Sequence, residues 1–484
     1  MASKPSIWPK VAPAQLILFK AFALITLLSL FIGIATDFYY LFAAPALVLL
    51  LYISVVDIRS IFYLLLVCIP LSNELYLPGG LATDLPTEPL MFGLMLLYFL
   101  YIFNNAQNID GRFFRHPITL LLFAHLIWIY VATMFSSELF VSIKFALAKT
   151  WYIVVFYFMG GLMLFKVKHF KTFFWLIFIP LITTIVIILL RHATEGFSFD
   201  KVNSILDPFY RNHVNYASIM ALFVPFIWYA RRWYPYRGSI WWYLMIGLLI
   251  VLIGIQFSFT RAAYVALFMA IGANWIIRSR LVRYVLAVSL VVALSFVGFM
   301  SYNNTYLDYA PNFERTVTHR DFGNLVGATA KGEDISTMER FYRWIAGVYM
   351  SGEKPVTGFG PGNFYNFYRS YTVTSFQTYV SDNPEKSGIH SYYLMTLTEQ
   401  GFPGLFIFIV LLFYSLIKGE QIYHEAKDPD RRQIIMTVLL SMVIISALLL
   451  INDMIETDKV GSFFFIHLAT LTNMDLAQKT ADQA

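Results

Sequence analysis

The stretch SIWWYLMIGLLIVLIGIQFS, residues 239–258, is a run of twenty residues without a charged side chain. An α-helix of about twenty residues rises about 30 Å, which matches the hydrocarbon thickness of a bilayer. Two further apolar runs, at 262–277 and 284–300, follow it directly. Three such runs in succession predict consecutive membrane-spanning helices, because a helix satisfies its own backbone polar groups inside lipid.

The composition of the whole chain agrees with this local signal. Hydrophobic residues make up 58% of its 484 residues and charged residues only 13%, whereas charged residues form about a quarter of a soluble domain. Disorder, a coiled coil and nucleic-acid binding are therefore excluded as the main interpretation. The single cysteine, Cys68, cannot form an intrachain disulfide or a thiolate metal site with other cysteines.

Apolar runs recur almost from end to end and predict an all-α, polytopic transmembrane bundle of about 12 to 14 spans. The third run is interrupted by Pro70 and the last one is short. The expected spans are 17–36, 38–56, 60–77, 88–104, 117–135, 149–165, 172–190, 213–230, 239–258, 262–277, 284–300, 401–417, 433–451 and 460–473.

The expected organisation has three parts. Residues 1–300 hold spans one to eleven, and residues 301–400 form one long outer loop between spans eleven and twelve. Short helices in this loop are expected to carry Arg340 and His390. Residues 401–484 hold the last three spans and a cytoplasmic tail.

The distribution of basic residues predicts the orientation. With the N-terminus inside, nineteen of the 35 Lys and Arg residues fall in the inner connections, so the positive-inside rule places both termini in the cytoplasm. The ionisable residues noted inside the expected spans are Lys20, His125 and His467. Ion-coupled transporters place acidic or paired charges near the midplane, so the chemistry is expected at the outer interface instead.

Arginine persists on the expected outer face, where the positive-inside bias normally removes it. This distribution indicates a function for guanidinium groups outside. The residues concerned are Arg191, Arg211, Arg261, Arg315, Arg320, Arg340, Arg343 and Arg369.

The outer loop contains a helix signal. Ser336-Thr337-Met338-Glu339 is typical of a capping box, and the helix that it begins is expected to stop at Gly352. Arg340 and Arg343 share one face of this helix. The alternative to a ligand-binding role for them is a solvated face with an ion pair between Glu339 and Arg343.

A glycine-rich turn follows, Gly358-Phe359-Gly360-Pro361-Gly362-Asn363-Phe364. Its glycines could let backbone N–H groups converge on an anion, although a purely structural turn is the more common case. It is not a P-loop, because the Gly-Lys-Ser/Thr that such a loop needs is missing.

His390 lies at the junction between the outer loop and a membrane helix. A neutral imidazole there could take a proton from a sugar hydroxyl near neutral pH, or it could be an interfacial histidine with a structural hydrogen bond. Arg261 and Arg211 open spans at the same face, and either could be a ligand or an interfacial anchor.

Together these pieces resemble the O-antigen ligase and O-antigen polymerase superfamily, which includes bacterial protein O-oligosaccharyltransferases. The resemblance rests on Arg261 opening a span, Arg340 with Trp344, the run from Pro355 to Phe364, and His390-x-x-Tyr-Leu followed by Glu-x-Gly. It covers roughly residues 205–420. One departure is Ser391, which stands where many relatives have asparagine and puts the histidine's hydrogen bond in question.

The resemblance implies transfer of a glycan from a polyprenyl diphosphate to an acceptor hydroxyl at the outer face of a bacterial inner membrane, without metal or cofactor. It implies that His390 acts as general base or positions the acceptor. The arginines that could stabilise the departing diphosphate are Arg261, Arg340, Arg211 and Arg343. Aromatic residues could stack on sugars or simply pack: Tyr365, Phe367, Tyr368, Tyr371 and Tyr379.

The acceptor stays open, because one scaffold serves ligases, polymerases and protein-glycosylating enzymes. It could be a lipid A core sugar, another lipid-linked repeat unit, or a protein Ser or Thr. Alternative functions are a transporter or flippase of a lipid-linked sugar, which needs a charged path through the bilayer, and a structural assembly subunit. Membrane lipid is an expected partner and nucleic acid is not.

Overall fold

The computed structural model describes residues 13–37, 41–42, 44–77, 81–105, 107, 111–164, 166–309, 335–378, 381–383 and 386–483. Three residues singled out from the sequence, Arg315, Arg320 and Tyr379, lie outside the described residues. The chain divides into two compact units, Met1–Leu64 and Leu65–Ala484.

The first unit contains α1 (Pro13–Ala35), α2 (Ala44–Val56) and the beginning of α3 (Ile58–Cys68). Helices α1 and α2 contact each other. Ile17, Phe19 and Phe31 are among the many apolar side chains of α1 that are exposed. A helix that is apolar on all sides is typical of a segment surrounded by lipid.

The second unit begins with a departure from the predicted spans. Helix α3 ends at Cys68, a 3-10 turn (Ile69–Leu71) follows, and β1 (Asn73–Leu77) pairs antiparallel with β2 (Leu81–Leu85). The predicted span 60–77 is therefore wrong beyond its first half. Pro70 cannot donate a helical hydrogen bond, and the polar residues that come after it favour a turn at the membrane surface.

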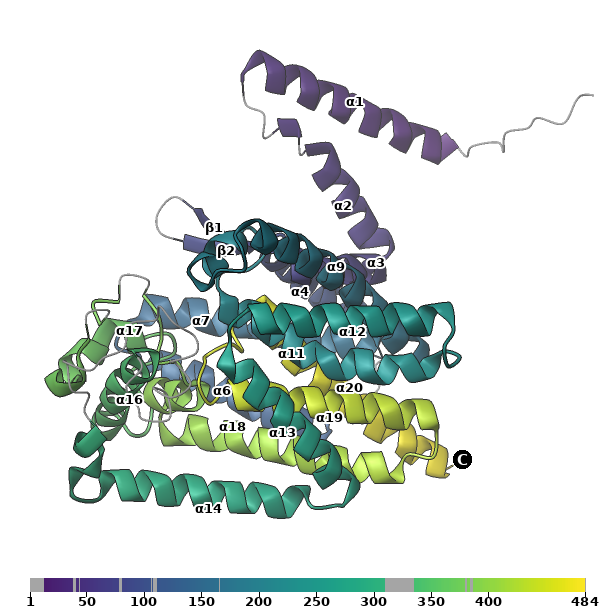
Figure 1. Ribbon diagram of the computed structural model, residues 1–484. Coiled ribbons are helices and arrows are strands. Elements are labelled where there is room, and N and C mark those ends of the chain that lie inside the picture. The colour runs from purple at the N-terminus through teal and green to yellow at the C-terminus, as the bar shows by residue number, and fades with distance from the viewer. Residues whose placement is uncertain are drawn as a thin grey trace, which may run out of the picture. The chain divides into compact units, whose positions relative to one another are not determined.

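The remainder of this unit is helical (Figure 1). Its helices are α4 (Thr87–Asn105), α5 (Gly111–Phe114), α6 (Pro117–Met134), α7 (Leu139–Tyr152), a π-helical segment (Ile153–Met159), α8 (Gly160–Met163), α9 (Val167–Thr194), α10 (Val202–Ile205), α11 (His213–Ala230), α12 (Ser239–Phe257), α13 (Arg261–Arg278), α14 (Val282–Ser301), α16 (Ile335–Glu353), α17 (Phe364–Phe367), α18 (Tyr392–Glu425), α19 (Pro429–Leu448) and α20 (Asp458–Gln483). Short 3-10 segments lie at Phe199–Lys201, Arg231–Trp233, Tyr302–Tyr309, Tyr368–Tyr371 and Thr374–Phe376.

Nine helices within the described ranges are long and apolar enough to cross a membrane. This confirms an all-α polytopic membrane protein, while the number of 12 to 14 spans stays a prediction. Helices α11, α13 and α20 coincide with the expected spans 213–230, 262–277 and 460–473 but are not among the nine.

Aromatic packing forms the core of the helical unit. The rings of Phe223 and Phe226 in α11 stack with centroids 4.9 Å apart, and Phe223 also stacks on Phe174 of α9 at 5.6 Å. Offset stacking at these separations is the favoured geometry of ring pairs. Helix α11 packs in turn against α19. In α14, by contrast, only Val282 is buried, so this helix presents nearly all of its surface outward.

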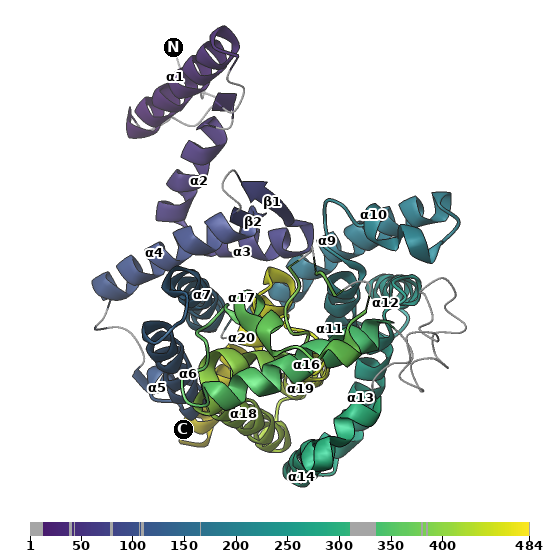
Figure 2. The same ribbon diagram turned by 90° about the vertical axis from the view of Figure 1, so that its left-hand side faces the viewer.

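Helix α16 crosses the N-terminal end of α18 (Figures 1 and 2). The crossing is close, because a Cβ atom at Gly347 would lie 2.4 Å from Ile389 Cδ1 and 3.2 Å from Thr398 Oγ1. Only glycine at this position lets the helix approach so near. Helix α16 confirms the predicted helix from Ser336 to Gly352. Its contact with α18 positions the site described next.

Candidate functional site

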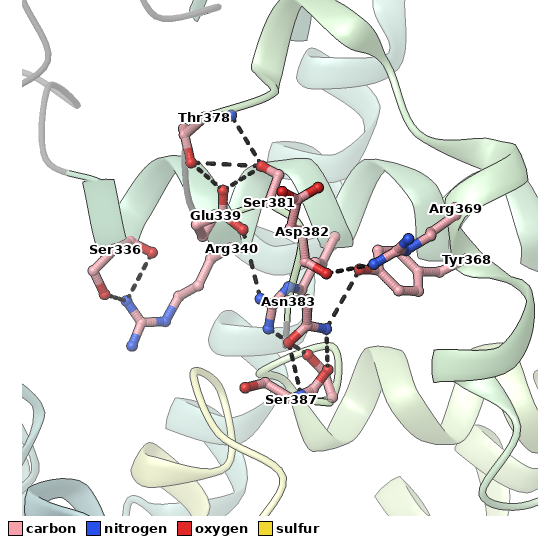
Figure 3. Close-up of polar contacts among 12 residues, drawn as sticks. Ser336, Glu339, Arg340, Tyr368, Arg369, Thr378, Ser381, Asp382, Asn383 and Ser387 are labelled. Atoms are coloured by element: carbon pink, nitrogen blue, oxygen red, sulfur yellow. Dashed lines mark hydrogen bonds and ion pairs between the residues drawn. The ribbon is translucent and has the colours of Figure 1, made fainter. Parts of the chain in front are cut away.

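The polar side chains in the first turn of α16 face different partners (Figure 3). Arg340 Nη1 donates hydrogen bonds to the Ser336 carbonyl oxygen at 3.1 Å and to Ser336 Oγ at 2.5 Å. Glu339 Oε1 accepts hydrogen bonds from Thr378 and Ser381. Glu339 thus holds the following loop against the helix, and neither of its carboxyl oxygens accepts a capping hydrogen bond from the described residues, as the sequence had suggested it would.

Arg343 lies one turn further along α16 and is buried. Its Nη2 atom lies 3.5 Å from Glu339 Oε2, so the ion pair expected as the alternative role is present. Its Nη1 atom donates a hydrogen bond of 3.0 Å to the Gly388 carbonyl oxygen. Arg343 therefore joins α16 to the residue two positions before His390.

The backbone around His390 is held at several points. His390 has a φ of 57°, a left-handed conformation that is uncommon for a non-glycine residue. Ser391 is the N-cap of α18, and its hydroxyl accepts a hydrogen bond from the Leu394 N–H. The Tyr392 N–H donates to the carbonyl oxygens of Leu449 and Asn452. Ser391 thus caps the helix in this chain, and its hydroxyl is occupied by that hydrogen bond.

The electrostatic surroundings of His390 keep its ring neutral. Its pKa is lowered to about 3, first because the ring is buried and then because Arg343 and Arg340 repel the protonated form. The arrangement therefore brings together three of the predicted site residues, His390, Arg340 and Arg343. At neutral pH the imidazole carries a free lone pair beside two fixed positive charges.

A carboxylate that the sequence did not single out lies against this group. A Cβ atom on Gly388 would be 2.0 Å from Asp453 Oδ2, so Asp453 occupies the space that a side chain would need. Burial and the neighbouring Glu456 raise the pKa of Asp453, while Arg343 and Arg211 lower it. Asp453 lies in the loop between α19 and α20, and the acidic residues clustered in that short loop are the signal that could have identified it.

The same loop is anchored to α7 by an ion pair that was also missed. Lys149, whose side chain is 3% exposed, pairs with Glu456 and donates a hydrogen bond of 3.2 Å to the Tyr392 hydroxyl. The predicted span began at Lys149, whereas the long apolar helix runs from Leu139 to Met163, so that Lys149 lies within it. The expectation that the spans contain almost no charged residues is therefore wrong at Lys149.

The two other predicted arginines lie at the beginnings of α11 and α13. Thr260, directly before Arg261, donates a hydrogen bond of 3.2 Å from its hydroxyl to the His213 carbonyl oxygen. This contact brings Arg261 near the segment that carries Arg211. Arg211 Nε lies 3.5 Å from Glu74 Oε2, and half of the side chain is exposed. The electrostatic interaction of Arg211 with Asp453 links it to the His390 group.

The glycine-rich turn binds a carboxyl group of the protein itself. Glu399 of α18 accepts hydrogen bonds from the N–H groups of Gly362 at 2.7 Å and Phe364 at 3.0 Å. A Cβ atom at Gly358 would lie 2.4 Å from the Glu399 carbonyl carbon. The turn thus wraps tightly around the kinked beginning of α18, where Gly401 has a φ of 70°. The structural interpretation of this turn accounts for its glycines.

Other expected outer residues have structural partners. Arg191 donates to the Asp207 carbonyl oxygen, and Arg369 donates to the Asp382 carbonyl oxygen. Tyr368 is fully buried and Tyr371 donates to Glu353, while the Phe367 ring packs on Phe359. Packing accounts for the Tyr368 ring. Tyr365, Phe367 and Tyr371 are half-buried, and their stacking on sugars stays a prediction.

Comparison with known proteins identifies a family. Residues 246–409 match the family model described as O-antigen ligase. The match runs from within α12 to within α18 and includes Arg261, Arg340, Arg343 and His390, whereas Arg211 lies before it. No curated protein matches the chain significantly. The match confirms the resemblance that the sequence motifs indicate and supports O-antigen-ligase-type glycan transfer in general.

Proposed function

We propose that the chain, which carries the O-antigen ligase match over residues 246–409, transfers a glycan from a polyprenyl diphosphate to an acceptor hydroxyl at the outer face of a bacterial inner membrane. The observation that carries the proposal is a half-buried, neutral His390 close to Arg343 and Arg340. A hydroxyl nucleophile needs a proton acceptor, and a departing diphosphate needs fixed positive charge. Helix α16 and the segment directly before α18, which Arg343 joins, supply both.

The arginines hold the diphosphate. Arg343 Nη1 and Nη2 already contact Gly388 and Glu339, which fix the plane of its guanidinium group. Its Nε–H is buried and has no hydrogen-bond partner among the described residues, so a phosphate oxygen that reaches this group would find one unused donor. Arg340 adds charge from the preceding turn. Arg211 and Arg261 complete the donor site from the beginnings of α11 and α13.

The reaction is a direct displacement at the anomeric carbon. The acceptor oxygen forms the new bond to this carbon while the bond from the carbon to the diphosphate oxygen breaks, and polyprenyl diphosphate leaves with the electron pair. His390 takes the proton of the acceptor hydroxyl. Attack opposite to the leaving group inverts the configuration of the sugar.

Donor binding activates His390 in this scheme. Arg343 and Arg340 help to lower the pKa of His390 to about 3, which makes it a weak base. A bound diphosphate neutralises the charge of the two arginines and raises the pKa of the ring. His390 therefore becomes a stronger base only when the donor is bound. An acceptor hydroxyl is then not activated while the donor is absent.

Asp453 acts as a positioning residue. It lies against Gly388 and interacts with both Arg343 and Arg211. A carboxylate between two guanidinium groups reduces their mutual repulsion and holds them at a separation suited to a diphosphate. Lys149 and Glu456 fix the loop that carries Asp453.

A defined assay tests the proposal. The purified protein, reconstituted in nanodiscs, receives a polyprenyl diphosphate oligosaccharide together with separate acceptors: a lipid A core, a second lipid-linked repeat unit, and a Ser/Thr peptide. Mass spectrometry identifies which acceptor gains the glycan. Transfer to one of them that is lost in His390→Ala supports the proposal, and undiminished transfer by His390→Ala refutes the role of the histidine.

The alternative functions give different results in related assays. A transporter of the lipid-linked sugar would move the donor across a proteoliposome membrane without forming a new glycosidic bond. An assembly subunit would do neither. Both termini are expected in the cytoplasm, and labelling of single cysteines placed in the loops after α14 and α19 from the outside would test that orientation.

A further inference from the structure

A cavity of about 350 Å³ lies in the second unit beside the hairpin β1–β2. This volume is in the range of small-molecule sites, at its lower end. The lining comes from the hairpin, the beginning of α4, the loop before α11, and the loop between α19 and α20. The residues are Ser72, Asn73, Glu74, Thr83, Asp84, Glu88, Asp207, Pro208, Phe209, Tyr210, Arg211, Asn215, Glu456, Thr457, Asp458 and Lys459.

The lining is polar and predominantly acidic. Six carboxyl groups line it against two cations, Arg211 and Lys459. Lys459 is occupied, because it pairs with Asp458 at 3.5 Å and donates to Ser72. Arg211 pairs with Glu74. The net formal charge of the lining is therefore negative, whereas Arg340 and Arg343 make the surroundings of His390 positive.

Two carboxyl groups of the lining can accept further hydrogen bonds. The Asp84 side chain is half-buried in the lining. Glu456 Oε2 is buried and has no hydrogen-bond partner within the described part of the chain. A buried acceptor that no described group of the protein satisfies, Glu456 Oε2, indicates that something else donates to it. Tyr210 and Asn215 add an aromatic surface and an amide.

The cavity is connected to the proposed reaction site through two of its lining residues. Arg211 interacts electrostatically with Asp453, which lies against Gly388. Glu456 Oε1 accepts a hydrogen bond of 3.4 Å from the Tyr392 hydroxyl, two residues after His390. A sugar in the cavity would therefore lie next to a diphosphate held by Arg211.

We propose that this cavity binds one sugar ring of the glycan substrate and selects neutral or amino sugars against sugars that carry a carboxylate or phosphate. The inference rests on the proposed glycan transfer and adds a specificity site to it. Carboxylates accept hydrogen bonds from sugar hydroxyl or ammonium groups, and such charge-assisted bonds are stronger than neutral ones. An anionic sugar would face several carboxylates with both nearby cations already paired.

The state of Asp84 fits hydroxyl recognition. Its pKa is raised to about 7, because the group is buried and Asp458 repels its charged form. Near neutral pH the carboxyl group can therefore accept or donate a hydrogen bond. A sugar hydroxyl can do the same, so the pair is satisfied in either protonation state.

Direct binding tests the cavity without any reaction. Saturation-transfer NMR on the protein in nanodiscs uses a panel of free sugars: glucose, galactose, rhamnose, N-acetylglucosamine, glucosamine, galactosamine, glucuronate and galacturonate. At least one neutral or amino sugar is expected to bind, and its uronate counterpart at least about tenfold more weakly. Asp84→Asn and Glu88→Gln should each weaken binding of the preferred sugar about tenfold, the loss of one charged hydrogen bond.

Kinetics then identify whether the sugar belongs to the donor or the acceptor. In the glycan-transfer assay, Asp84→Asn should raise the KM for one of the two substrates about tenfold and leave kcat within about twofold. The substrate whose KM rises is the one that places its sugar in the cavity. Asp200→Asn is the matched control, because it removes an exposed carboxylate that does not line the cavity.

The outcomes separate this inference from the proposed function. If no sugar of the panel binds, if uronates bind as tightly as neutral sugars, or if both cavity variants bind and react like wild type, the inference is wrong. Absence of transfer by wild-type protein, or transfer by His390→Ala, would instead overturn the proposed reaction. The thermal midpoint of each variant must match wild type, and two independent substitutions guard against one that misfolds.

Discussion

Arg343 Nη1 lies 3.0 Å from the carbonyl oxygen of Gly388 and donates a hydrogen bond to it. This bond ties the helix that supplies positive charge to the backbone that presents His390. The same guanidinium group is paired with Glu339, which the loop residues Thr378 and Ser381 hold by their hydroxyls. The Arg343 side chain thus connects the loop held by Glu339 to the backbone that precedes His390, the proposed general base.

Arg343→Lys is expected to reduce kcat/KM for glycan transfer nearly as much as Arg343→Ala, by about 100-fold or more. Loss of one charged donor to a developing anion has an effect of about this size. Lysine keeps the charge but cannot contact Gly388, Glu339 and a phosphate oxygen with one planar group. Steady-state kinetics with the lipid-linked donor would measure this, and full activity of Arg343→Lys would show that charge alone is sufficient.

His390→Gln is expected to lower kcat by about 100-fold to 10,000-fold, the usual contribution of a general base. The KM for the donor should change little, because the proposed mechanism assigns binding of the diphosphate to the arginines. Glutamine has a similar size and keeps a hydrogen-bonding group, so the thermal midpoint should remain close to wild type. A loss of donor binding equal to the loss of kcat would indicate a binding role in place of proton transfer.

The pH dependence should depend on Arg343. His390 in the free enzyme has a pKa of about 3, so kcat/KM of wild-type protein should not fall through protonation of this ring between pH 8 and about pH 5. Removing the positive charge in Arg343→Gln removes a repulsion of the imidazolium and raises the pKa toward the ordinary value of about 6.5. The residual activity of this variant should then fall at a higher pH than that of wild type.

Arg369→Gln is the control for that profile. Arg369 is exposed and donates to the backbone of Asp382, so its removal should leave the pH dependence unchanged. If kcat/KM of wild type and of Arg343→Gln fell at the same acidic pH, burial alone would set the pKa of His390.

Gly388→Ala should lower both activity and the thermal midpoint, because the added Cβ would lie 2.0 Å from Asp453 Oδ2. The carboxylate must move away, and its interactions with Arg343 and Arg211 weaken. Gly352→Ala is the matched control, since a Cβ there has no atom within 4 Å. In the double variant with Asp453→Ala, the thermal midpoint should recover relative to Gly388→Ala while the activity stays low.

The sequence predicted those features that depend on local patterns. Apolar runs gave most of the long helices, and the Ser336–Glu339 signal gave α16. His390, Arg340 and Arg343 are near one another as the shared helix face and motif order suggested. The roles of Asp453, Glu456 and Lys149 could not be predicted, because their partners are distant along the chain and become neighbours only through helix packing. The third predicted span was too long, because hydrophobicity alone does not take account of Pro70 and the polar residues after it.

Glu399→Gln is expected to destabilise the protein by about 2 kcal/mol and to disorder the glycine-rich turn, without entering the reaction itself. Both carboxyl oxygens of Glu399 accept hydrogen bonds, from Gly362 N–H at 2.7 Å and Phe364 N–H at 3.0 Å. A glutamine keeps one acceptor and turns an NH₂ group toward the other N–H, so one buried donor loses its partner, at a cost of this size. Thermal unfolding in nanodiscs would measure the change, and hydrogen exchange should increase at residues 358–364. Because the turn is bound to the protein's own carboxyl group, donor affinity should fall far less than in Arg343→Ala. An equal loss of donor affinity in both variants would mean that the turn, and not the arginine group, holds the diphosphate.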